Sequence, residues 1–78
     1  MILKEKDKKF LKSLGSKIRR ARFEKDFSQE ELAFRAGLDR TYITGIEKGE
    51  RNISVITLNK LADALSINIL QLLNGSAK

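Results

Sequence analysis

The stretch QEELAFRAGLDRTYITGIEK, residues 29–48, decides the fold of this 78-residue chain. Its small and apolar residues recur at the three- and four-residue spacing that places side chains on one side of an α-helix. Gly37 interrupts the pattern and allows the left-handed backbone of a tight turn. The spacing therefore predicts two short helices joined by a turn, a helix-turn-helix over about residues 28–48. The inward-facing positions are Leu32, Ala33, Ala36, Ile43 and Ile46.

Both helices of this pair begin with residues that stabilise a helix N-terminus. Ser28 followed three residues later by Glu31 is the pattern of a capping box, in which the hydroxyl and the carboxylate satisfy backbone amides. Asp39 can cap the second helix in the same way. We therefore expect both helices to start where the pattern places them.

The outward side of the second helix carries side chains suited to DNA. A recognition helix meets base edges in the major groove at its first turn. At that turn Arg40 offers two donors for guanine, and Thr41 offers a methyl group for thymine. Tyr42 could reach a phosphate or pack against the first helix. Structural corners that bind nothing share the small residues but not this set of donors. The predicted outward residues are Arg40, Thr41, Tyr42, Thr44, Gly45 and Lys48.

Charge is distributed unevenly along the chain. The net charge is +6, and residues 1–27 hold ten Lys or Arg against four Asp or Glu, whereas residues 28–78 hold six of each. The N-terminal excess could steer the protein to DNA or simply solvate an exposed helix. A basic membrane-surface helix is disfavoured, because four carboxylates interrupt the basic face. Those residues are Glu5, Asp7, Glu24 and Asp26.

Composition excludes several function classes. The chain has no cysteine and no histidine, and it contains no glycine-rich phosphate loop, so we expect no enzyme activity, no metal and no cofactor. Its N-terminus lacks the apolar region of a secretory signal, and no stretch approaches 18 apolar residues. These features predict a cytoplasmic protein.

Hydrophobic periodicity extends the pattern to a single all-α domain of five helices. We expect the first helix over about residues 10–25, with residues 1–9 flexible and Phe10 on its inner side. Ser54 should cap a fourth helix that ends near Leu65, and Asn68 a short fifth over residues 69–74. The G-S-A-K sequence that follows is read as a polar tail.

Two groups of residues outside the helical pair are candidate contacts. Arg51 and Asn52 are donors in the loop after the recognition helix, suited to phosphates or to ordinary loop polarity. Ile56, Ile69 and Leu70 exceed what one small core can absorb. They favour a homodimer interface over the alternative of a slightly apolar surface, since this short chain has no disulfide or zinc to stabilise it.

Four motifs carry a family resemblance over about residues 14–74. The chain resembles the Cro and CI-type repressors, the xenobiotic-response-element family of bacterial and phage regulators. It looks most like the controller proteins of restriction-modification systems, small dimers that regulate their own operon and the nuclease gene. The resemblance implies a compact lambda-repressor-like domain. The motifs are S-Q-E-E-L-A from Ser28, A-G-L-D-R-T-Y-I from Ala36, G-I-E-K-G-E-R-N-I-S from Gly45, and L-A-D-A-L with L-L-N-G near the end.

The resemblance also assigns roles to individual residues. It implies that Arg22 and Glu47 form a pair that ties the first helix to the end of the recognition helix. The chain departs from the family at Leu70, where a polar residue is common, and at Gly45, which replaces a longer base-reading side chain. The implied DNA contacts are Arg40, Thr41 and Tyr42 on bases and Gln29, Arg51 and Asn52 on the backbone, to which we add Thr44 and Lys48 from their outward position.

The leading hypothesis is a transcription regulator that binds a palindromic operator in double-stranded DNA as a homodimer. RNA polymerase is a further candidate partner. The alternatives are a stand-alone phage or plasmid repressor of the same fold, or an antitoxin whose main partner is a protein.

Overall fold

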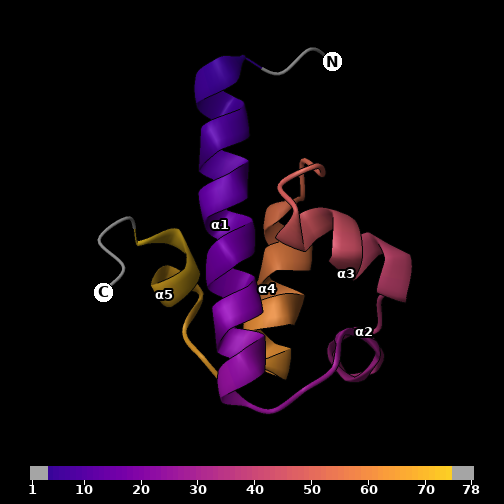
Figure 1. The fold of residues 1–78 in the computed structure, drawn as a ribbon. Coiled ribbons are helices and arrows are strands. Elements are labelled where there is room, and N and C mark those ends of the chain that lie inside the picture. Colours follow the sequence, from indigo (N-terminus) through magenta and orange to yellow (C-terminus); the bar gives the residue numbers. More distant parts are fainter. Residues whose placement is uncertain (1–3, 75–78) are drawn as a thin grey trace.

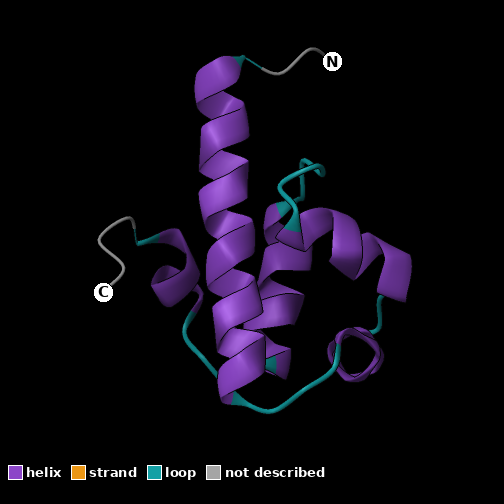
Figure 2. Cartoon of the chain, viewed as in Figure 1, coloured by secondary structure: helices purple, strands orange, loops and turns teal. Residues whose placement is uncertain are grey.

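The structure, a computed structural model, describes residues 4–74, and these form five α-helices and no strand (Figure 2). The predicted all-α class and five-helix architecture are confirmed. In Figure 1 the long first helix stands upright, the second and third lie on one side of it and the fifth on the other. The helices are α1 (Glu5–Glu24), α2 (Gln29–Ala36), α3 (Arg40–Glu47), α4 (Val55–Ala64) and α5 (Ile69–Leu73).

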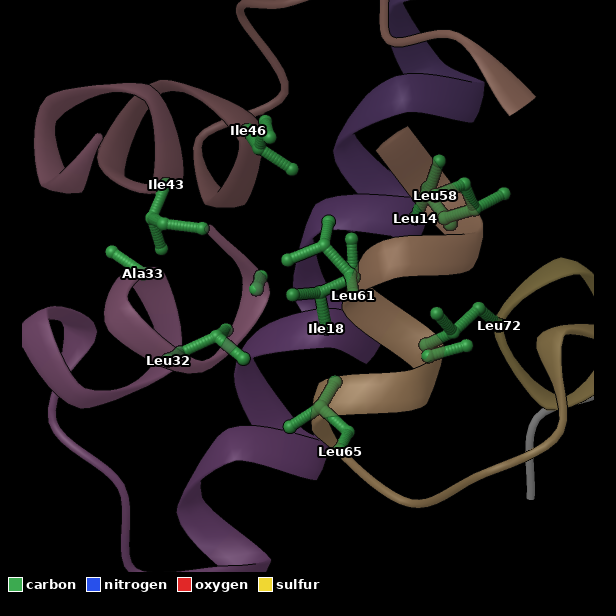
Figure 3. Close-up of a cluster of buried hydrophobic side chains, with 12 residues drawn as sticks. Leu14, Ile18, Leu32, Ala33, Ile43, Ile46, Leu58, Leu61, Leu65 and Leu72 are labelled. Carbon is green, nitrogen blue, oxygen red and sulfur yellow. The ribbon is translucent and has the colours of Figure 1, made fainter. Parts of the chain in front are cut away.

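One core holds the five helices together, and each of them contributes to it (Figure 3). Ile18 of α1, Leu32 of α2, Ile43 of α3 and Leu61 of α4 are completely buried, and Leu72 brings α5 into the same cluster. A fully buried side chain of this size stabilises the fold by about 1.5–3 kcal/mol. The inward positions predicted for the helix-turn-helix pair are all in this core.

The first helix begins at Glu5, earlier than the predicted start near Phe10. Glu5 and Asp7 lie in its first turn, where negative charge is favoured by the helix dipole, and Asp7 accepts a hydrogen bond from the Lys4 amide. Residues 5–9 are therefore helical, while the expected flexibility of residues 1–9 stays a prediction; residues 1–3 and the predicted polar tail lie outside the described residues. Phe10 is 54% exposed, so its predicted place on the inner side is also wrong.

Side-chain caps start the other four helices as the sequence predicts. Oxygens of Ser28, Asp39, Ser54 and Asn68 accept backbone amides at the first turns of α2, α3, α4 and α5. The Ser28 capping box is only half formed, because the Glu31 carboxylate instead accepts a hydrogen bond from Arg35 Nε at 2.6 Å. The capping residues thus fix the starts of these four helices.

Backbone-to-backbone packing sets the recognition helix against α1. A Cβ atom on Gly15 would collide with the carbonyl oxygen of Ile46 and lie 2.7 Å from that of Glu47. Only glycine permits this approach, since no side chain fits between the two backbones. The same glycine looks merely destabilising in the sequence, but it brings the middle of α1 against the C-terminal end of α3.

Candidate nucleic-acid interface

A tight turn and a capping carboxylate orient the start of α3. Gly37 closes α2 with a left-handed φ of 70°. Two residues later Asp39 accepts hydrogen bonds from both the amide and the hydroxyl of Thr41, at 2.9 and 2.6 Å. These bonds hold the pKa of the Asp39 carboxyl below its ordinary value of 3.8, the hydroxyl contributing most. The carboxylate is therefore charged near neutral pH and rigidly caps the recognition helix.

The first turn of α3 presents Arg40 and Thr41 to solvent. Within residues 4–74 the Arg40 guanidinium forms no hydrogen bond, so its donors are available to a partner. The Thr41 hydroxyl hydrogen is used by Asp39, which leaves the methyl group as the part of Thr41 best suited to a base contact. One turn and two turns further along the same side lie Thr44 and the exposed Lys48.

A buried ion pair fixes α3 to α1. Arg22 Nε and one terminal nitrogen of Arg22 donate to the two carboxylate oxygens of Glu47, at 2.8 and 3.0 Å. The other terminal nitrogen donates to the Phe27 carbonyl at 2.9 Å. The two side chains are only 8% and 4% exposed. The structure therefore brings together the pair that the resemblance implies, and the Phe27 carbonyl is a partner that the sequence did not indicate.

Gln29 and Thr44 are connected to this ion pair by hydrogen bonds between α2 and α3. Gln29 Nε2 donates to Glu47 Oε1 at 3.1 Å, while Gln29 Oε1 accepts from the Thr44 hydroxyl at 2.9 Å. The network of Arg22, Glu47, Gln29 and Thr44 thus connects α1, α2 and α3. Both Gln29 and Thr44 are half-buried, and their use in this network is a role that sequence reasoning missed.

Arg51 fills the place that Gly45 leaves open on α3. The sequence placed Gly45 among the outward residues, but it is buried, because the Arg51 side chain lies over it: a Cβ on Gly45 would be 3.0 Å from Arg51 Cγ and Nε. The guanidinium continues to the Tyr42 ring, 5.5 Å from its centroid, and Tyr42 is half-buried against the core. A glycine within a helix lowers the stability of the fold by about 0.5–1 kcal/mol relative to alanine. A glycine in the middle of a predicted helix is therefore a feature of the sequence that could indicate close packing of another group.

The predicted dimer residues belong to the last two helices, α4 and α5. Ile56 on α4 and Leu70 on α5 are 70% and 65% exposed, while Ile69 is half-buried against the core. Val55 and Leu73 are further exposed apolar side chains of the same two helices, which the sequence reasoning did not single out. The role of this surface as a dimer interface stays a prediction.

Comparison with known proteins now defines the class of this chain. The helix-turn-helix family matches residues 18–72, so the chain belongs to that family. The relatives of this chain in that family include control proteins and helix-turn-helix transcriptional regulators. Among residues 4–74 no helix is long and apolar enough to cross a membrane, and no group of three potential ligands could hold a metal ion.

Individual relatives are restriction-modification controller proteins. The control protein C.MunI of a Mycoplasma species is 42% identical over 65 residues, 82% of this chain and 88% of that protein. The crystal structure of the controller protein C.AhdI from Aeromonas hydrophila is 47% identical with a TM-score of 0.78, covering 80% of this chain and 94% of that chain. The C.Esp1396I controller tetramer in complex with its natural 35 base-pair operator is 32% identical with a TM-score of 0.78, covering 87% and 93%. The resemblance to controller proteins is confirmed.

Proposed function

We propose that this protein is a sequence-specific, double-stranded DNA-binding transcription regulator, the controller protein of a restriction-modification system. The observation that carries the proposal is the exposed first turn of α3, where the Arg40 guanidinium has no internal hydrogen-bond partner. The relatives with the same fold are controller proteins, and one of them is known in complex with its operator. Such a regulator works in the cytoplasm, with RNA polymerase as the partner whose access or recruitment it changes.

The residues of the interface divide into those that would contact bases and those that would contact phosphates. Arg40 would donate two hydrogen bonds to guanine and Thr41 would contact a thymine methyl, each good bidentate contact being worth about 1–3 kcal/mol of discrimination. The Arg51 guanidinium lies over the Tyr42 ring. This contact would hold the guanidinium at the edge of the DNA groove, within reach of a phosphate. Further phosphate contacts would come from Lys48, Asn52 and the second amide hydrogen of Gln29 Nε2, whereas the Thr44 hydroxyl hydrogen is already donated to Gln29.

The network behind α3 supports this role. DNA readout requires a recognition helix that does not shift when its side chains engage bases, because each displaced donor loses its geometry. The bidentate pair between Arg22 and Glu47 fixes the C-terminal end of α3, and Thr44 is held by Gln29 near its middle. The outer face of α3 would thus determine base preference, and the contacts of its inner face would keep the helix in position.

A homodimer would place two recognition helices on one side of the duplex. The exposed side chains of Ile56 on α4 and Leu70 on α5 are apolar, and association of two copies would bury them. Two-fold symmetric helix-turn-helix dimers read half-sites about 10 base pairs apart, one helical turn of DNA. We therefore expect a palindromic operator with that spacing.

Selection from a pool of random duplexes, followed by a salt titration on the selected sequence, tests the proposal. We expect an enriched palindrome whose affinity falls by orders of magnitude between about 50 and 200 mM salt, because phosphate contacts release counterions. No enrichment, or an enriched sequence whose affinity does not change with salt, would contradict the proposal and would favour the alternative of an antitoxin with a protein partner.

A further inference from the structure

A lysine-lined groove separates the N-terminal half of α1 from the turn that follows α3. Four lysines line it, together with two carboxylates and one glycine. The N-terminal half of α1, which lines one side of the groove, extends past the other helices (Figure 1). Its lining residues are Glu5, Lys8, Lys9, Lys12, Lys48, Gly49 and Glu50, and the four lysines among them are called here the lysine ridge.

Backbone packing makes the lysine ridge a fixed part of the fold. Gly49 has a φ of 77°, and a Cβ added to it would lie 2.7 Å from Lys12 Cα, so the turn after α3 rests directly on α1. Lys8 and Lys12 are one helical turn apart and share one side of α1, with Lys9 beside them. The charges of two segments far apart in the sequence are therefore held together.

The lysine ridge continues the proposed DNA-facing side of α3. Arg40, Thr44 and Lys48 follow one another at four-residue spacing, and Lys48 belongs both to this row and to the groove. The row therefore leads from the first turn of α3 to the groove. A polyanion that lies along α3 would meet the α1 lysines next.

These α1 lysines lie outside residues 18–72, the part of the chain that the helix-turn-helix family model matches. The match begins at residue 18, whereas Lys8 is ten residues earlier, about 15 Å along the helix axis. The first turns of α1 bury little, since all of residues 4–10 are exposed and only Leu11 begins the inner stripe. The core therefore does not require this extension, and its charge favours a role in binding.

We propose that the lysine ridge binds the DNA phosphate backbone just outside each half-site, adding flanking contacts from α1 residues that precede the family match. Charge complementarity carries the assignment: four ammonium groups face two carboxylates in the groove, next to a surface proposed to lie on a duplex. The inference rests on the proposed DNA-binding function. It assigns affinity for flanking DNA, and no base preference, to Lys8, Lys9 and Lys12.

The test compares two double variants of α1 on long and short duplexes. The first variant is Lys8→Gln with Lys12→Gln. The matched control is Lys17→Gln with Lys25→Gln, which removes the same charge from the same helix; Lys17 lies on its other side, next to α5, and Lys25 at its C-terminal end. Binding to the selected palindrome is measured as a function of salt, with and without flanking base pairs.

On the long duplex, we expect the log–log salt slope of the first variant to be shallower than that of the parent by about 3 to 4 for a dimer, because each lysine that neutralises a phosphate contributes about 0.9 to the slope. The control should keep the parent slope, and trimming the flanks should weaken the parent but not the first variant. Equal slopes for the parent and the first variant, or equally reduced slopes in both variants, would overturn the inference and leave the proposed function intact. Failure of the parent to bind any duplex would instead refute the proposed function, and the flanking contacts with it.

Discussion

Replacing Arg22 with alanine should separate the rigidity of the recognition helix from its base preference. The change removes two of the three hydrogen-bond donors of the Glu47 carboxylate and leaves only Gln29 Nε2. It also removes the donor to the Phe27 carbonyl. Because the Glu47 side chain is 4% exposed, water cannot readily replace the missing donors. The variant therefore keeps a buried, poorly compensated charge.

The expected loss in the free energy of unfolding is about 3–5 kcal/mol, the range for breaking a buried ion pair from one side. A domain of this length has a total stability of about 4–12 kcal/mol. Each kcal/mol shifts the melting temperature of such a domain by about 4–8 °C, so the melting temperature should fall by at least about 10 °C. In the Arg22→Ala background, Glu47→Gln should recover part of this loss because it removes the stranded charge.

Thermal melts followed by circular dichroism measure this effect, with Arg35→Ala as the matched control. Arg35 pairs with Glu31 on the surface, where the two side chains are 49% and 43% exposed, so its loss should cost about 0.2–1 kcal/mol. Base preference should persist in the folded fraction of Arg22→Ala. A melting temperature of Arg22→Ala equal to that of the parent would refute the assigned role of the ion pair.

Three further changes test other parts of the structure. Gly15→Ala should destabilise the fold by at least about 1–3 kcal/mol in urea unfolding, because its Cβ meets the backbone of α3; wild-type stability would show that the two helices can separate at no cost. Because the pKa of Asp39 is lowered, its carboxylate stabilises the fold above pH 3.8, and this contribution is lost as the pH falls below that value. Asp39→Asn should therefore make the melting temperature depend less on pH in this acid range; an unchanged pH dependence would contradict the assignment. Ile56→Lys with Leu70→Glu should shift sedimentation toward the monomer, whereas Phe34→Glu, at an exposed apolar position on α2, should not; identical dimerisation of both would exclude this interface.

The sequence predicted the elements whose signals are local. Ser28 and Asp39 mark the starts of α2 and α3, Gly37 marks the turn, and the apolar spacing gives the core face, since capping and periodicity depend on residues a few positions apart. The start of α1 at Glu5 differs from the predicted start near Phe10, because the N-cap residue is Lys4, whose side chain gives no capping signal in the sequence. Its first turn is stabilised by acidic side chains among the lysines.

Contacts between distant segments were the part that the sequence could not give. Gly15 and Gly45 each cost helix stability locally, and only the fold shows that α3 backbone and the Arg51 side chain occupy the space beside them. Likewise, the pairing of Gln29 with Thr44 depends on the crossing of α2 and α3. The pair of Arg22 with Glu47 was accessible only through the family resemblance, because nothing in the spacing of the two residues brings them together.

The central claim is that the outer first turn of α3 reads DNA sequence, and Arg40→Ala tests it most directly. Arg40 is exposed and caps nothing, so the variant should melt like the parent, and Arg20→Ala on α1 serves as the control. Binding-site selection should show a palindrome for parent and control, and for Arg40→Ala the same palindrome with preference relaxed by about 1–3 kcal/mol at one base pair in each half-site. Selection of an identical site with undiminished preference by Arg40→Ala would contradict the claim.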